Sequence, residues 1–259
     1  MMRWAVTGVV LGSLVASLVF APAGWLAGAL YGVTAQRLLL ADARGTVWQG
    51  SAVFVLTGGE GSHDASALPG RLHWTLGLDG MALALRARHA CCINGELRLR
   101  LVPGLAGLRV ELPAVQGPIG QWPAAWLVGL GTPWNTVQPS GSLQLSSTGL
   151  KVQSVQGRWR FDGQAVLELG SMASRLSTLP VLGSYRLQLQ SAAAEGEAAA
   201  VELATTSGAL QLSGSGQWSS SKFRFSGQAS AAAGSEAALS NLLNIIGRRK
   251  GALSLISIG

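Results

Sequence analysis

The stretch GELRLRLVP, residues 95–103, decides the fold class of this chain. Leu97, Leu99 and Leu101 alternate with two arginines. Successive side chains of a strand point to opposite faces, so this pattern gives one apolar face and one charged face. The stretch therefore predicts a β-strand with one side against a core and the other in water.

The same alternation recurs along the chain, in GSLQLSS (141–147), YRLQLQS (185–191) and KFRFSGQ (222–228). Turn signals separate such segments, as in LDG (78–80), whose Asp-Gly pair suits a tight hairpin. Between Thr46 and Ser230 we therefore expect a mainly β fold, in which repeated hairpins form a curved antiparallel sheet.

The composition agrees with many short strands joined by tight turns. The chain has 259 residues, 35 of them glycine, and only 12% are charged, against roughly 25% in an ordinary globular domain. The net charge is +7, but it comes from scattered arginines, and the densest cluster is Arg248, Arg249 and Lys250. This is a weak signal, so we expect no nucleic-acid partner.

The N-terminal region contains no charged residue between Arg3 and Arg37. The apolar run from Trp4 to Phe20 would extend roughly 25 Å as a helix, and continuation to Leu30 would give a full membrane span. Arg3 favours a cytoplasmic N-terminus. We expect the chain to contact the membrane through residues 4–30.

A cleaved signal peptide is the alternative, because APA (21–23) matches the small-x-small pattern of a cleavage site. The apolar run is longer than the usual apolar core of a signal peptide, so we favour the anchor. On that interpretation residues 1–33 form a membrane anchor with a juxtamembrane helix. Residues 34–259 form an exported β-rich domain.

Two segments predict helices. GQWPAAWLVGLG (120–131) reads as a short apolar helix in the middle of the chain. Residues 236–246 predict a C-terminal helix, with Ser235 as its cap and Gly247 at its end. Its apolar residues at helical spacing predict packing on the sheet, with a partner-binding helix as the alternative; they are Leu239, Leu242, Leu243 and Ile246.

A tryptophan-glycine unit repeats. GTVWQGSAVFVL (45–56) resembles QGRWRFDGQAVLEL (156–169), and a looser copy surrounds Trp218. The repeat predicts two similar halves, about 45–118 and 139–259. We interpret the unit as architecture rather than as a site, with these signature residues: Gly45, Trp48, Gly50, Trp159, Gly163 and Trp218.

The chain's two cysteines, Cys91 and Cys92, are adjacent. Neighbouring strand residues point apart, so a disulfide between them needs a distorted backbone. A vicinal disulfide, a bridge to another molecule and two free thiols all remain open, as does a redox role. Without a histidine or further cysteine at ligand spacing, we expect no zinc site.

Catalytic motifs are missing from the sequence. The three histidines form no HxH or HExxH pattern, and neither a nucleophile elbow nor a phosphate or dinucleotide loop is present. Glu60, His63 and Asp64 gather in one glycine-rich segment, which we interpret as a solvated loop rather than a metal site. We expect no enzyme activity, no catalytic residue, no cofactor and no metal.

Several segments in a fixed order resemble the type II secretion system protein N family. They are APAGWLAGAL (21–30), ADARGTVWQGSA (41–52), GRLHWTL (70–76), PSGSLQLSSTGL (139–150), LPVLGSYRLQLQ (179–190), SGALQLSGSGQW (207–218) and EAALSNLLNIIGRR (236–249). The segment ACCING (90–95) departs from the family pattern.

The resemblance implies a non-catalytic accessory or assembly subunit of a bacterial secretion machine. It would be a single-pass inner-membrane protein, with a cytoplasmic N-terminus and a periplasmic C-terminal domain, and its partners would be other subunits of that machine. The alternative is a periplasmic lipid-handling protein of the AsmA-like type. An open apolar trough would favour lipid handling, and a concave face filled by the protein's own side chains would favour a scaffold.

Overall fold

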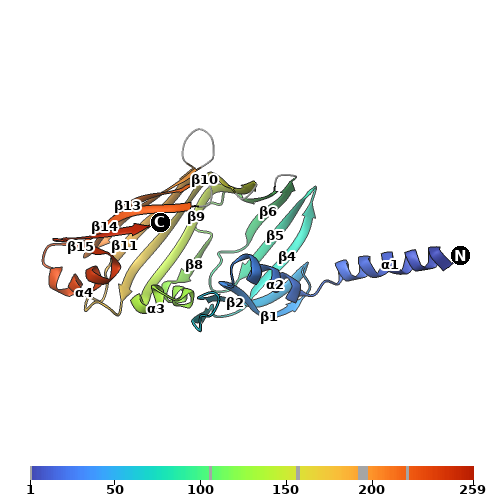
Figure 1. Cartoon of the computed structure of the whole chain (residues 1–259), viewed down its shortest axis with the longest axis horizontal. Helices are drawn as coiled ribbons and strands as arrows, with labels where there is room; N and C mark the ends of the chain where they lie inside the picture. The colour runs from blue at the N-terminus through green and yellow to red at the C-terminus, as the bar shows by residue number, and fades with distance from the viewer. Residues whose placement is uncertain (1, 105–106, 156–157, 192–197, 220–221) are drawn as a thin grey trace.

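The computed structural model describes residues 2–104, 107–155, 158–191, 198–219 and 222–259. Within these ranges sixteen strands belong to one sheet, and all its pairings are antiparallel. The predicted mainly β fold is therefore confirmed (Figure 1).

The helices of the described chain are few and mostly short. They are α1 (Met2–Val19), α2 (Ala23–Val33), the 3₁₀ helix η1 (Ala124–Leu130), α3 (Trp134–Val137) and α4 (Glu236–Ile246). The strands are β1 (Leu38–Gly45), β2 (Gln49–Thr57), β3 (Ala65–Ala67), β4 (Leu72–Asp79), β5 (Ala82–His89), β6 (Leu97–Gly104), β7 (Gly107–Leu112), β8 (Gly120–Pro123), β9 (Pro139–Val155), β10 (Arg158–Ser174), β11 (Gly183–Ser191), β12 (Ala198–Gly208), β13 (Leu210–Ser219), β14 (Lys222–Ala231), β15 (Arg248–Lys250) and β16 (Leu253–Ile258).

The strand order nearly follows the chain. It runs β1-β2-β4-β5-β6-β7-β9-β10-β11-β12-β13-β14-β16-β15, while β3 pairs with β2 and β8 with β9. Strands β7 and β9 join the early and late parts of the sheet, from Arg109 opposite Gln153 to Leu112 opposite Leu150. The sheet is therefore continuous from one part to the other.

The turn predicted at LDG is present, shifted by one residue. Asp79 pairs with Ala82, so the loop between β4 and β5 consists of Gly80 and Met81. Gly80 has a φ of 64°, which glycine adopts at little cost and which two-residue hairpins require. Met81 is 94% exposed at the tip.

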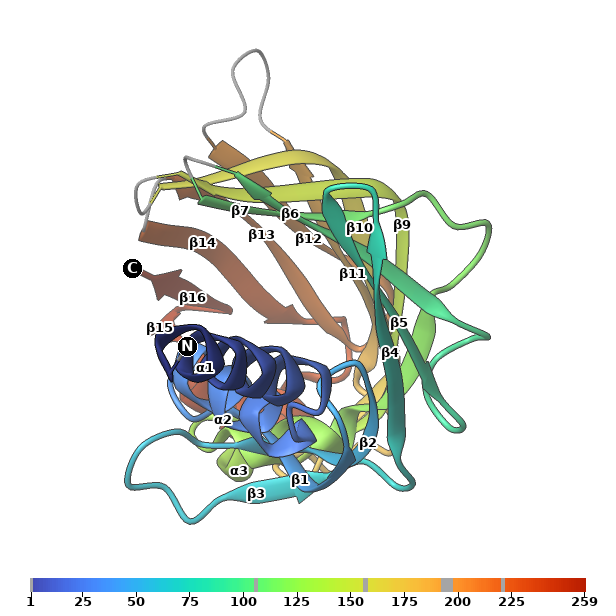
Figure 2. The same cartoon turned by 90° about the vertical axis from the view of Figure 1, so that its right-hand side faces the viewer.

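The sheet is strongly curved, so that its strands wrap around an interior (Figure 2). Register shifts interrupt the pairing of β10 with both neighbours, between Gly170 and Ala173 on one side and between Leu169 and Met172 on the other. Ser171 there has a φ of 47°. Bulges of this kind bend a strand and increase its twist, which explains the curvature at this end of the long strands.

The apolar N-terminal segment is two helices, not the single span expected over residues 4–30. Helix α1 ends at Val19 and α2 begins at Ala23, because Pro22 adopts an extended conformation (φ −67°, ψ 146°) between them. Helix α1 projects from the body (Figure 1). Among the described residues, no helix is both long enough and apolar enough to cross a membrane.

Helix α2 packs on the sheet. Ala23 is buried with Leu40, Ala52 and Trp74, and one face of the helix covers this cluster. The core of the early strands therefore depends on a helix that precedes them.

Helix α4 fills the interior near the C-terminal end of the sheet. Leu239, Leu242 and Leu243 are at most 2% exposed and pack in a cluster that includes Tyr185 and Leu210. The predicted packing of this helix on the sheet is thus confirmed. Ser235 is the N-terminal flanking residue, but its side chain makes no capping hydrogen bond.

The middle segment predicted as a helix is divided. Residues 120–123 form β8 against β9, and only residues 124–130 are helical, as η1. Gly129 allows η1 to approach the sheet, because a Cβ there would lie 2.5 Å from the Leu56 carbonyl oxygen.

Candidate functional site

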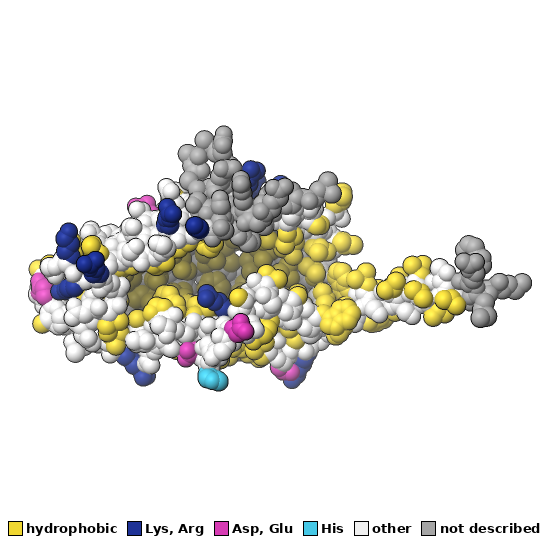
Figure 3. Space-filling model, viewed as in Figure 1, with side chains coloured by type: hydrophobic (Ala, Val, Ile, Leu, Met, Phe, Trp, Pro, Cys, Tyr) yellow, Lys and Arg dark blue, Asp and Glu magenta, His cyan; other side chains and the backbone are white. Residues whose placement is uncertain are grey.

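An open apolar trough lies on the concave face of the late strands. It has a volume of about 510 Å³, within the roughly 300–1,000 Å³ of small-molecule sites. Its lining comes from β9 to β14 and is apolar throughout: Leu145, Val152, Phe161, Ala165, Leu167, Leu187, Leu189, Val201, Trp218 and Phe223. Figure 3 shows a hollowed hydrophobic surface between the rims of the sheet.

The trough follows from period-two alternation kept in register across neighbouring strands. Leu167 of β10 lies opposite both Leu145 and Leu187. In the next row, Leu189 of β11 lies opposite Ala165 and Val201. Because each strand turns alternate residues to the same side, these rows make a continuous apolar floor.

Aromatic rings gather at one end of the trough. Trp218 has its ring centre 5.9 Å from that of Phe161 and 5.7 Å from that of Phe223. Trp218 remains 37% exposed. Phe225 lies against the bare backbone of Gly214, where a Cβ would come within 2.5 Å of the ring. The aromatic end therefore offers flat apolar surface that no side chain of the described protein fully covers.

The other end of the interior is closed. The α4 leucines fill it beside Tyr185, whose hydroxyl donates to the Leu210 carbonyl at 3.1 Å. Burial raises the pKa of Tyr185 above its usual value, so this group stays a neutral donor. The concave face is thus filled near α4 and open over β9 to β14.

The convex face of the same strands is polar. Arg186 donates to Glu168 at 2.9 Å, and glutamines alternate with the trough leucines along β11. The sheet therefore separates a wet outer face from an apolar inner one, which matches the alternation seen in the sequence.

Trp48 lies in the turn between β1 and β2 and ties α1 to the sheet. Its indole N–H donates to the Leu18 carbonyl in the last turn of α1 at 2.8 Å. The adjacent Val47 N–H donates to the Ala21 carbonyl at 2.9 Å, and Thr46 forms a bridge with Pro22. This turn holds the α1–α2 junction in place.

The two glycines of this signature have different roles. Gly45 (φ 88°) is the last residue of β1, at the start of the turn. Gly50 lies within β2 opposite Gly45 rather than in a turn. A side chain at Gly50 would overlap the ring of Trp74, which is 3% exposed and donates its indole N–H to the Val47 carbonyl at 3.0 Å. Trp74 was missed as a structural residue, although it occupies an apolar position of the period-two pattern.

The later signature residues lie in β10 and β13. Trp159 pairs with Ser154 near the start of β10, and its side chain lies outside the described part of the chain. Gly163 (φ 107°) sits beside a register shift, where a Cβ would overlap the Gly149 backbone. Trp218, near the end of β13, lines the trough. Trp48 and Trp218 thus share a pattern but not a role.

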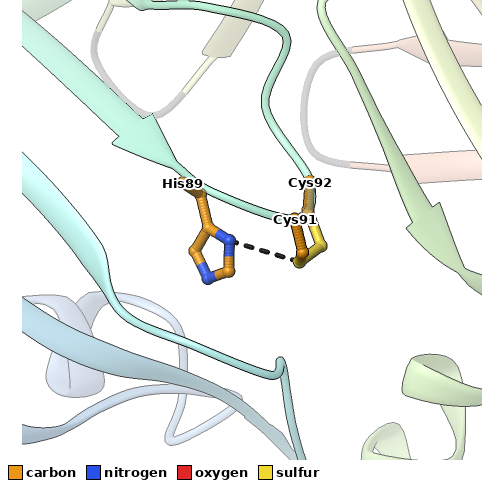
Figure 4. Close-up of a disulfide and its surroundings, with 3 residues drawn as sticks. All are labelled: His89, Cys91 and Cys92. Carbon is orange, nitrogen blue, oxygen red and sulfur yellow. Dashed lines mark hydrogen bonds between the residues drawn. A yellow bond between two sulfur atoms is a disulfide. The ribbon is translucent and has the colours of Figure 1, made fainter.

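Cys91 and Cys92 form a vicinal disulfide in the turn after β5. The Nδ1 atom of His89 lies 3.3 Å from the sulfur of Cys91 (Figure 4). His89 is only 3% exposed, and burial, with a smaller contribution from the charge of His73, lowers its pKa. The expectation that no histidine accompanies the cysteines was wrong, since His89 lies two residues before Cys91.

The Glu60, His63 and Asp64 segment is a loop, and these groups do not converge. Asp64 accepts hydrogen bonds from the Asn135 amide at 3.0 Å and from the Ser62 hydroxyl at 3.3 Å, while Glu60 and His63 are exposed. Among the described residues, the one group of three metal-ligating side chains identified is His89, Cys91 and Cys92.

Comparison with known proteins gives one match. The family model for type II secretion system (T2SS) protein N matches residues 36–255. No curated protein and no solved structure matches the chain. The family match covers the whole sheet apart from the last residues of β16, so the chain belongs to the type II secretion system protein N family and is a component of that system.

Proposed function

We propose that the chain is a non-catalytic accessory subunit, held at the bacterial inner membrane by its apolar N-terminal residues 4–30, with its sheet on the periplasmic side. The observation that carries the anchor is the exposure of α1. Its large apolar side chains from Val6 to Val19 are more than half exposed; they include Val9, Leu11, Leu14 and Leu18. An unpartnered apolar helix of this kind is stable in lipid and unfavourable in water.

The anchor is favoured over a cleaved signal peptide. Ala21 and Ala23 of the small-x-small segment are at most 4% exposed. The Leu18 carbonyl, which a cleavage at this segment would remove, receives the Trp48 indole N–H. These contacts join α1 to the folded sheet.

Membrane fractionation of the full chain tests the anchor. Wild type is expected to resist extraction with alkaline carbonate and to retain its N-terminal residues by mass spectrometry. The variant Leu11→Arg/Leu14→Arg is expected to be extracted, because each central arginine costs about 2.5–3.5 kcal/mol on insertion. A wild-type mass that begins after residue 21 would contradict the proposal.

Crosslinking in cells tests the accessory role. A photoreactive residue at Gln190, on the polar face of β11, is expected to capture another inner-membrane or periplasmic subunit of the secretion system. Deleting the protein is expected to lower export of folded substrates. Export at the wild-type level, without a captured subunit, would count against the accessory role.

Handling of lipid acyl chains is the second candidate, and the open trough supports it. A peptide segment in a wholly apolar trough would leave its N–H and C=O groups unpaired, at a cost of about 1–3 kcal/mol each. An acyl chain carries no such groups. Each methylene taken from water would contribute about 0.8 kcal/mol, and exchange with a bilayer would be nearly neutral because both surroundings are apolar.

Matched variants on one strand separate the two roles. Leu189→Glu places a charge in the trough, and Gln190→Glu places the same charge on the convex face. Phospholipid is expected to remain with the detergent-purified full chain and with Gln190→Glu, at a stoichiometric amount by native mass spectrometry. It should be lost from Leu189→Glu. Equal amounts of lipid in all three proteins would mean that the lipid binds outside the trough. This result would contradict the acyl-chain role and leave the accessory role unaffected.

A further inference from the structure

Three metal-ligating side chains meet at the turn that follows β5. His89, Cys91 and Cys92 each offer one ligand atom, and these atoms all lie within 4.8 Å of one another. In an extended strand the two cysteines would point apart. The turn at residues 90–92 brings both sulfurs to the same side, next to the His89 ring (Figure 4).

Among the described residues, the side chain of His89 has no hydrogen-bond partner outside the cysteine pair. Its Nδ1 faces the Cys91 sulfur at 3.3 Å. Its Nε2 is buried and has no hydrogen-bond partner among the described residues. An unpaired buried group of this kind costs about 1–3 kcal/mol, so packing alone does not account for His89.

The three groups differ in their access to solvent. Cys91 is exposed, whereas Cys92 and His89 are each 3% exposed. A small reagent or ion can therefore reach Cys91 first, and the other two groups provide a shielded inner side.

We propose that His89, Cys91 and Cys92 form a three-ligand site for a thiolate-binding metal ion, Cu⁺ or Zn²⁺, once the disulfide is reduced. A dithiol reductant supplies two electrons and two protons; the S–S bond breaks to give two thiols, and the reductant becomes a disulfide. When the ion binds, both thiols release their protons and coordinate as thiolates. One imidazole nitrogen of His89 completes the set.

The present geometry is close to what such an ion needs. Zinc lies about 2.3 Å from sulfur and about 2.0–2.1 Å from nitrogen, so tetrahedral angles place two ligating sulfurs about 3.8 Å apart. Opening the S–S bond leads toward this spacing, within the 4.8 Å that the ligand atoms already span. Thiolate and imidazole together suit Cu⁺ and Zn²⁺ rather than Mg²⁺ or Ca²⁺.

The site would act on β8, which pairs with β9. The Cys92 carbonyl accepts the Gln121 N–H at 3.1 Å, and the Asn94 N–H donates to the Ile119 carbonyl at 2.9 Å. The metal and disulfide states of the turn are thereby linked to the segment that leads into β8.

Metal titration of the full chain in detergent tests the proposal. Protein reduced with a phosphine under nitrogen is expected to bind one equivalent of Zn²⁺ or of Cu⁺, measured in separate titrations. The oxidised protein, with the same sequence, is expected to bind neither at this site. Binding of either ion alone supports the proposal and identifies the preferred metal.

Variants assign the ligands. Cys91→Ser is expected to abolish binding, and His89→Gln to weaken it at least about tenfold. His63→Gln, in the exposed loop, is the matched control and should bind as wild type does. The proposal is overturned if reduced protein with two titratable thiols binds neither ion, or if His89→Gln binds as tightly as wild type. Cys91→Ser, at an exposed position, carries the test if His89→Gln fails to fold.

Discussion

Trp48 stabilises the junction between helix and sheet through a single indole N–H. The acceptor is the Leu18 carbonyl, one of the last carbonyls of α1, which have no partner within the helix. Together with the Val47–Ala21 hydrogen bond and the Thr46–Pro22 bridge, this bond fixes where α1 leaves the body.

Trp48→Phe keeps a ring and removes this donor. The free energy of unfolding should fall by about 1 kcal/mol, measured by chemical denaturation in detergent. Trp25→Phe, at a position 61% exposed, is the control and should leave stability unchanged. A Trp48→Phe protein as stable as the control would show that the bond contributes nothing.

Asp42, at the register shift within β1, makes the stability of this strand sensitive to acid. Hydrogen bonds from Arg44 and then Arg71 hold the pKa of Asp42 below its usual value. The stability from this carboxylate is therefore fully present above the unfolded pKa near 3.8 and is lost as pH falls through the lower folded pKa.

Asp42→Asn removes the charge and tolerates the same backbone, because asparagine accepts the φ of 49° found here. Wild type should have the higher melting temperature at pH 6, and the difference should shrink as pH falls below 4. A difference that stays constant over this range would exclude the carboxylate as its source.

Helix α4 contributes three buried leucines to the core: Leu239, Leu242 and Leu243. Leu242 is 2% exposed in the cluster with Tyr185, whereas Ile245 on the same helix is 46% exposed. The two positions separate the buried stripe from the solvent side.

Leu242→Ala is expected to lower the free energy of unfolding by about 2–5 kcal/mol, from lost burial and the cavity left behind. Ile245→Ala should change it by less than about 0.5 kcal/mol. Chemical denaturation of the full chain measures both, and equal losses would mean that α4 packs differently.

Period-two alternation predicted the strands because it records which face of each strand contacts solvent, and this can be read from a few neighbouring residues. The apolar N-terminal run could not predict the break at Pro22. The Pro22–Thr46 bridge and the Ala21–Val47 hydrogen bond, which hold the chain there, come from residues far along the chain. The helix at residues 120–131 was half right for the same reason, since pairing with β9 converts its first four residues to a strand.

The candidate sites were less predictable than the fold. The trough depends on curvature and on register between strands, and neither can be read from one strand alone. The His89–Cys91 spacing was present in the sequence, but a strand at that point would have turned Cys92 to the opposite face. The turn at residues 90–92 brings them together.

At the scale of the whole molecule, the open edges of the sheet must not pair with strands of other molecules. Its last strand, β15, consists of three exposed cations, Arg248, Arg249 and Lys250. Charged residues on a short edge strand oppose addition of another strand.

Replacing Arg248, Arg249 and Lys250 with threonine should therefore promote self-association, seen as a higher mass by light scattering at the same protein concentration. Arg186→Thr, within the interior strand β11, removes a charge without changing an edge and should leave the mass unchanged. An edge variant with the wild-type mass would show that these charges do not prevent pairing.

The near-sequential strand order also bears on the order in which the strands can fold. Apart from β1, which is first, and β15, which pairs with the later β16, each strand of the main path pairs with a strand that precedes it in the chain. Local pairing of this kind lowers contact order and speeds folding. A chain that becomes available from its N-terminus can therefore add strand after strand to a growing edge, and α4, β15 and β16 are added last.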